Sequence, residues 1–203
     1  MKKIIPALFA AILILVIYTI NQNALSYTSG APTGSTNAPG ETTCSSNGGS
    51  CHALFPVTNT GGTTLMAMED ISNGYVPGTT YTIMPFVNED GSSKIGFQTV
   101  ALLPKGQPAG SVTITNSKTQ MNTNAGKEYV THSASGTTGI LLMDWMYEWT
   151  APAAGSGTVT IYGTFLATNN DMTASGDSIY TDLLMIPEKS TGIFSEEISG
   201  FRL

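Results

Sequence analysis

The stretch "GILLMDWMYEWTAP", residues 139–152, alternates large apolar side chains with smaller or polar ones. Successive side chains of a β-strand point to opposite faces, so one face of this segment is predicted to be apolar and the other polar. The apolar face holds Leu141, Met143, Trp145, Tyr147 and Trp149, and the polar face holds Asp144, Glu148 and Thr150. Burying two Trp rings and a Tyr ring stabilises a fold by on the order of 10 kcal/mol before conformational entropy is subtracted. The apolar face is therefore predicted to line a core between two layers of extended backbone.

Short apolar or alternating runs of the same kind recur through most of the chain, separated by turns rich in Gly, Pro, Asn and Asp. Eight strands are predicted, at residues 63–69, 79–88, 94–103, 110–116, 128–132, 140–150, 157–168 and 178–186. Many short strands with turn signals between them are typical of a sandwich or barrel. The fold class is predicted to be all-β, an immunoglobulin-like antiparallel β-sandwich of about eight strands.

The amino-acid composition agrees with the all-β class and excludes one class of binding partner. The chain has 203 residues, of which 41% are hydrophobic and only 11% charged, with 22 glycines, as expected for one turn-rich domain. Its formal net charge is -6. Affinity for nucleic acid comes chiefly from Lys and Arg, so nucleic acid is excluded as a partner.

The N-terminus is typical of an exported protein. Lys2 and Lys3 precede a long apolar run, and Ala24-Leu25-Ser26 follows it as a small-x-small cleavage site. Residues 1–26 are predicted to be a signal peptide, with an uncleaved N-terminal membrane anchor as the alternative. Membrane contact is expected only through this segment, if it is retained.

The rest of the chain divides into three parts by composition. Residues 27–56 form a Gly- and Pro-rich irregular segment with Cys44, Cys51 and His52, residues 57–188 form the sandwich, and residues 189–203 form a C-terminal tail.

Four segments carry a likeness to a known family. They are "YEWTAPAAGSGTVTIYGTFLATN" at 147–169, "GYVPGTTYTI" at 74–83, "GFQTVAL" at 96–102 and "VTHS" at 130–133. Together they resemble the Reeler (reelin-type) domain, and more closely the bacterial secreted relatives known as choice-of-anchor V domains. The likeness spans about Gly30 to Glu188.

The resemblance implies a sandwich on the outside of bacterial cells, secreted or at the cell surface, with the periplasm as an alternative. It implies a module for adhesion or recognition and no catalytic activity. It also implies that the segment with the two cysteines matches a region where many relatives carry C-x-x-C-H, the haem attachment pattern, and that a His is common at the position of His132.

The stretch "TCSSNGGSCH" at 43–52 holds both cysteines of the chain, and two chemistries compete for it. The first is a disulfide between Cys44 and Cys51, which can form in an oxidising compartment. Gly48 and Gly49 allow the loop between the two cysteines to reverse tightly. The second is a covalent c-type haem on Cys44, Cys51 and His52, with His132 by preference, or one of the nine methionines, as the other axial ligand. Six residues separate the cysteines here instead of two, so the disulfide is the prediction and the haem the alternative.

Three further metal hypotheses rest on oxygen and nitrogen donors. His52 and His132 could hold zinc or copper together with thiolates or carboxylates. Asp90 lies in "NEDGSS" at 88–93 and Asp171 and Asp177 lie in "NNDMTASGD" at 169–177, two polar loops with oxygen donors for calcium. Both loops are also interpreted as ordinary turns.

Two functional hypotheses follow. The first is a secreted, non-enzymatic sandwich that binds a protein or a surface glycan, or assembles with its own copies. The second is an electron-transfer protein that uses haem on Cys44, Cys51 and His52.

Overall fold

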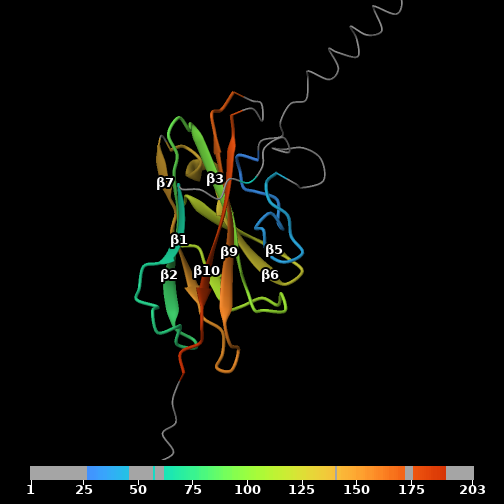
Figure 1. Cartoon of the computed structure of the whole chain (residues 1–203), viewed down its shortest axis with the longest axis vertical. Coiled ribbons are helices and arrows are strands. Elements are labelled where there is room, and N and C mark those ends of the chain that lie inside the picture. Colours follow the sequence, from blue (N-terminus) through green and yellow to red (C-terminus); the bar gives the residue numbers. More distant parts are fainter. Residues whose placement is uncertain (1–26, 46–56, 58–61, 140, 172–175, 191–203) are drawn as a thin grey trace, which may run out of the picture.

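The computed structural model describes residues 27–45, 57, 62–139, 141–171 and 176–190, and these contain ten strands and one short 3-10 helix (Figure 1). The strands are β1 (Thr63–Ala67), β2 (Thr80–Asn88), β3 (Lys94–Leu102), β4 (Ser111–Thr113), β5 (Thr119–Asn124), β6 (Lys127–His132), β7 (Leu142–Asp144), β8 (Tyr147–Thr150), β9 (Val159–Thr168) and β10 (Ser178–Ile186). The helix η1 covers Ala134–Gly136. No helix within these residues is long and apolar enough to cross a membrane.

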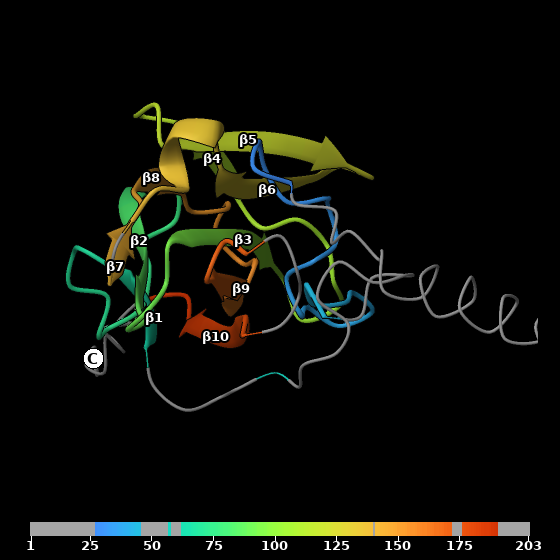
Figure 2. The same cartoon turned by 90° about the horizontal axis from the view of Figure 1, so that it is seen from above.

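The strands form two antiparallel sheets of five strands that pack face to face (Figure 2). The first sheet has the order β1-β2-β8-β4, with β7 also paired to β2, and the second has the order β10-β9-β3-β6-β5. Most pairs are distant in sequence, as in a sandwich whose chain passes repeatedly between its layers. The predicted all-β sandwich is confirmed.

The aromatic face of β7 and β8 lines the space between the sheets. Trp145, Tyr147 and Trp149 are each at most 2% exposed and belong to one core cluster. The Trp149 ring meets Tyr75 edge to face at a centroid distance of 5.8 Å. Its indole N–H donates to the carbonyl of Ala109 at 2.8 Å, so the ring is buried without losing a hydrogen bond. The predicted position of this face is confirmed.

Leu141 is an exception on that face. The alternation predicts that Leu141 points into the core, but it is 47% exposed and its φ is +74°. A leucine in the left-handed region marks a turn rather than a strand, so the alternation begins only after it.

The predicted strand 140–150 is divided in two because of a proline on its neighbour. Phe86 pairs with Asp144 and Ile83 pairs with Tyr147, so β7 and β8 keep one register against β2. Between them Pro85 accepts the N–H of Trp145 at 3.0 Å but has no N–H to donate in return. One ladder bond is missing, and the strand is interrupted without slipping.

One strand of the structure is not among the eight predicted strands. β5, with the sequence "TQMNTN", pairs with β6 along its whole length at the edge of the second sheet. It has no apolar alternation, because neither of its faces lies on the main core. The predicted strand at 110–116 is also shorter, at Ser111–Thr113.

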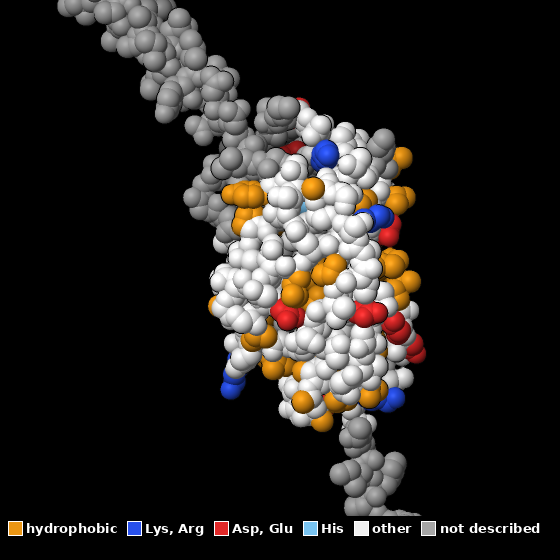
Figure 3. All heavy atoms as spheres, turned by 180° about the vertical axis from the view of Figure 1, so that it is seen from behind, with side chains coloured by type: hydrophobic (Ala, Val, Ile, Leu, Met, Phe, Trp, Pro, Cys, Tyr) orange, Lys and Arg blue, Asp and Glu red, His pale blue; other side chains and the backbone are white. Residues whose placement is uncertain are grey.

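Carboxylates from the second sheet reach an edge strand of the first sheet on each side of the sandwich. Asp182 of β10 accepts the N–H of Leu65 in edge strand β1 at 2.8 Å, and Glu128 of β6 accepts the N–H of Val112 in edge strand β4 at 2.6 Å. These two bonds engage one backbone donor on each of these edge strands within the chain. Seen from behind, the molecule shows hydrophobic side chains in small separate groups with Asp and Glu side chains among them (Figure 3).

Candidate functional site

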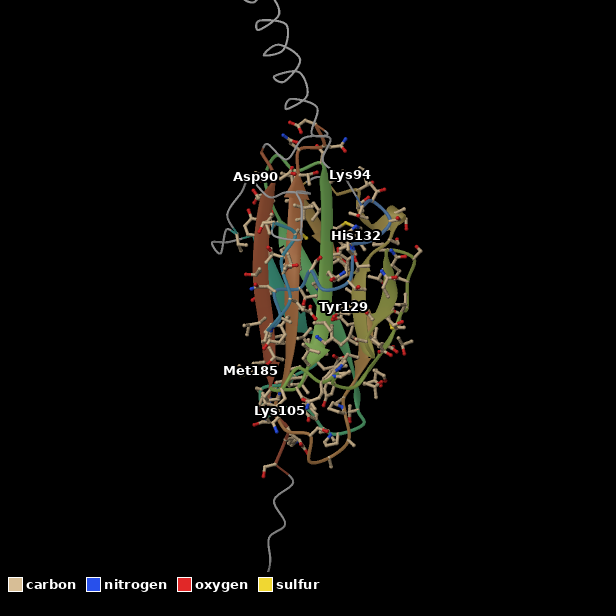
Figure 4. All side chains as sticks on the ribbon, turned by 90° about the vertical axis from the view of Figure 1, so that its right-hand side faces the viewer. Asp90, Lys94, Lys105, Tyr129, His132 and Met185 are labelled. Atoms are coloured by element: carbon tan, nitrogen blue, oxygen red, sulfur yellow. The ribbon has the colours of Figure 1, made fainter. Side chains whose placement is uncertain are left out.

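The N-terminal irregular segment lies across the outer face of the second sheet, and we call residues 27–45 the strap (Figures 2 and 4). The sequence explains why the chain of the strap reverses direction. In Ala38-Pro39-Gly40-Glu41 the N–H of Glu41 donates to the carbonyl of Ala38 at 2.8 Å, and Gly40 has φ +81°. Proline followed by a residue with positive φ is the pattern of a type II turn, which Gly adopts without strain. The chain then returns, and the N–H of Thr42 donates to Gly34 O at 3.0 Å.

Gln98, in the middle of β3, fixes the strap to the sheet. Its Oε1 accepts the N–H of Ser35 at 2.8 Å, and its Nε2 donates to the carbonyls of Ala31 and Pro32 at 3.0 and 2.9 Å. The side chain is fully buried, so these bonds replace water that it cannot reach. Its neighbour Thr131 accepts the N–H of Ala31 at 3.0 Å.

A small apolar cluster and an ion pair hold the turn of the strap. Ala38 packs on Val100, Leu102 and Tyr129 of the sheet. Glu41 accepts the hydroxyl proton of Tyr129 at 2.6 Å. It also pairs with the ammonium of Lys127 at 2.8 Å and accepts the hydroxyl of Thr36 at 2.6 Å. Burial raises the pKa of Glu41, but the hydrogen bonds from Lys127, Thr36 and Tyr129 outweigh it, so the pKa is lowered overall.

His132 connects the first residue of the strap to the sheet. Its Nδ1 accepts the N–H of Phe97 at 3.1 Å, where β6 diverges from β3, and its Nε2 lies 3.0 Å from the carbonyl of Tyr27. These partners fit a neutral ring with its proton on Nε2. Burial lowers the pKa of His132, against a smaller opposite effect of the carbonyls of Tyr27 and Phe97. Gly96 makes room for the ring, since a Cβ there would lie 2.7 Å from Cε1.

The structure places only part of the predicted cysteine site. Cys44 is half-buried near the end of the strap, while Cys51 and His52 lie outside the described residues. Both the disulfide and the haem stay predictions. His132, the predicted axial ligand, uses both ring nitrogens in hydrogen bonds, so ligation of a metal would require it to release Phe97 or Tyr27.

The predicted calcium and metal donors are not brought together in the described part of the chain. Asp90 is exposed in the β2–β3 turn and Asp171 is exposed after β9, where its N–H bonds to Asn169 Oδ1 at 3.1 Å. Asp177 is buried at 6% exposure just before β10. No three His, Cys, Asp or Glu residues gather at one point among the residues described.

The residues that hold the strap are not among the predicted site residues. A signal for Gln98 is present in the sequence, because an amide side chain stands inside the largely apolar strand "GFQTVAL". A polar side chain at a buried strand position needs a hydrogen-bonding partner above it, and this points to a segment that covers the outer face. Glu41 carried no such signal, since acidic residues are ordinary in loops.

Comparison with solved structures gives a consistent likeness. The crystal structure of the Reelin-N domain of F-spondin matches with a TM-score of 0.51 and 23% identity, over 65% of this chain and 89% of that one. A crystal structure of the human F-spondin reeler domain matches with a TM-score of 0.48 and 23% identity, over 66% of this chain and 96% of that one.

Comparisons with protein-family models and with curated proteins give no match. The closer kinship to choice-of-anchor V domains stays a prediction. The likeness to the F-spondin domain concerns the fold, and it agrees with the sheets described above. This chain has the β-sandwich fold of a Reeler domain.

Proposed function

We propose that this protein is an exported, non-enzymatic recognition module that binds a protein partner through the outer face of its second sheet. The N-terminal segment with its two lysines and apolar run supports export. The Reeler-type fold supports a module of extracellular type.

The proposal rests on the division of this outer face into a part that the strap covers and a part that it leaves uncovered. The strap covers its β3 and β6 side, while β10 leaves large apolar side chains uncovered on the other. Leu183 is 52% exposed and Met185 is 62% exposed, and Leu183 pairs with the partly buried Tyr162 of β9. We call these three residues the β10 strip; Figure 4 labels Met185 on it. Exposed apolar side chains beside a polar rim are typical of a protein-binding surface.

The use of the polar side chains supports a binding role over a catalytic one. His132, Gln98 and Glu41 would be natural candidates for proton transfer or polarisation, but each holds the strap in place. The haem hypothesis has no support among the described residues, and we do not propose it.

Binding to intact cells of the producing organism tests the proposal. Labelled wild-type protein should bind saturably, and the double variant Leu183→Ser, Met185→Ser should bind at least tenfold more weakly. Leu142→Ser is the matched control, because Leu142 is also 52% exposed but lies on the other sheet. Absence of saturable binding, or equal loss in the control, would contradict the proposal.

A further inference from the structure

Three methionines stand side by side on the outer face of the first sheet. Met66 of β1 pairs directly with Met84 of β2. The pairs Phe86–Asp144 and Ile83–Tyr147 put Met84 opposite Met146, between β7 and β8. Residues paired in this way share a face and have Cβ atoms about 4.5–5.5 Å apart. The three thioethers therefore form one row across three adjacent segments of the sheet.

The row is open to solvent although it belongs to a sheet whose other face is the core. Met66 is 37% exposed and Met146 is 36% exposed, while Met84 between them is half-buried. Met68, two residues beyond Met66 on the same side, is 53% exposed. Methionine is unbranched, so neighbouring side chains can turn their sulfur atoms toward a common point.

Carboxylates flank the row on both sides. Asp144 lies opposite Phe86, two residues from Met84 along β2. Glu148 lies opposite Thr82, two residues from Met84 in the other direction. Glu69 adds a carboxylate at Thr82, where it accepts the backbone N–H at 2.8 Å. None of the five strands of this sheet contains a lysine or an arginine. The field around the thioethers favours a cation.

We propose that Met66, Met84 and Met146 form a surface site for a soft monovalent cation, copper(I). Neutral thioether sulfur is a soft ligand that selects copper(I) over the harder divalent metals. Three such ligands complete a trigonal set, and the flanking carboxylates balance the positive charge without ligating it. This site is separate from the strap and the β10 strip, and it does not depend on the proposed binding function.

Methyl NMR on protein labelled with ¹³C at the methionine methyl groups tests the site residue by residue. Silver(I) nitrate serves as an air-stable probe with the ligand preference of copper(I), and copper(I) itself follows under anaerobic conditions. The titration is done on the wild-type chain and on a Cys44→Ser, Cys51→Ser variant, in which thiolates cannot compete. The methyl signals of the three row residues should shift together and saturate at one equivalent.

Met121 and Met185 are internal controls, since they are 37% and 62% exposed on the second sheet. Met84→Leu, and separately Met66→Leu, should weaken silver(I) binding about tenfold or more, because loss of even an outer-shell partner costs about 10- to 100-fold in metal affinity. Leucine conserves volume, and an unchanged Tm shows that the sheet is intact.

Affinity should be the same at pH 7 and pH 5, because a thioether has no proton to lose. The proposal is overturned if the row methyls shift no more than those of Met121 and Met185, if Met84→Leu binds as well as wild type, or if affinity falls tenfold between pH 7 and pH 5.

Discussion

Replacement of Gln98 by alanine tests whether one amide fixes the strap to the sheet. The substitution removes three hydrogen bonds, one accepted from Ser35 and two donated to Ala31 and Pro32, at 2.8 to 3.0 Å. A net contribution of about 0.5–1.5 kcal/mol for each predicts a loss of about 3 kcal/mol in the free energy of unfolding. The buried N–H of Ser35 and C=O of Ala31 would also lose their partners unless the strap lifts into water.

The assay is urea unfolding combined with hydrogen exchange of the Ser35 amide. The variant should unfold at lower urea, and the Ser35 amide should exchange much faster than in wild type. Gln98→Glu has nearly the same shape but sets a carboxylate against the carbonyls of Ala31 and Pro32, so it should destabilise at least as much.

Thr164 supplies a matched control. It lies directly opposite Gln98 on β9, it is fully buried, and its hydroxyl has no hydrogen-bond partner within the described structure. Thr164→Val should therefore leave stability unchanged or raise it slightly. A Gln98→Ala variant within about 0.5 kcal/mol of wild type, with Ser35 still protected, would refute the reasoning.

Three more outcomes are expected. Burial holds the pKa of His132 below its usual value of 6.5, so the unfolded chain binds the proton more readily than the folded chain. The free energy of unfolding should therefore fall as the pH drops below about 6.5. Urea titrations from pH 7.5 to 5.5 check this, and an equal fall of the unfolding free energy with pH in the His132→Asn variant would argue against it. Tyr147→Phe should cost about 1–2 kcal/mol in urea unfolding, because it leaves the buried Thr99 hydroxyl without its 3.0 Å partner, and adding Thr99→Val should recover part of the loss. The predicted bond between Cys44 and Cys51 should give an intact mass two hydrogens below that of the reduced chain, whereas a mass raised by one haem would mean that the disulfide prediction is wrong.

The layers of the fold were predictable because their signal is periodic. Trp145, Tyr147 and Trp149 alternate with polar residues, and such a pattern can be satisfied only by a strand with one buried face. The interruption between β7 and β8 was not predictable from that segment, because its cause is Pro85 on a different strand. β5 is not predictable for a related reason, since a strand outside the core has no need of apolar alternation.

The strap was predictable as an irregular segment but not as a cover. Its sequence shows where it turns, at Pro39 and Gly40, but gives no indication of which surface it meets. That depends on pairs about 60 to 100 residues apart, such as Ser35 with Gln98 and Ala31 with Thr131. The methionine row is similar, because its members become neighbours only through the register of the strands.

The two cross-sheet carboxylates limit how copies of this protein can join. Asp182 and Glu128 already occupy backbone donors on β1 and β4, the strands from which the first sheet could otherwise be extended. An incoming strand would have to displace a charged acceptor that is tethered to the same molecule. Crowding many copies on a surface should therefore not lead to ribbon-like growth of the first sheet from β1 or β4.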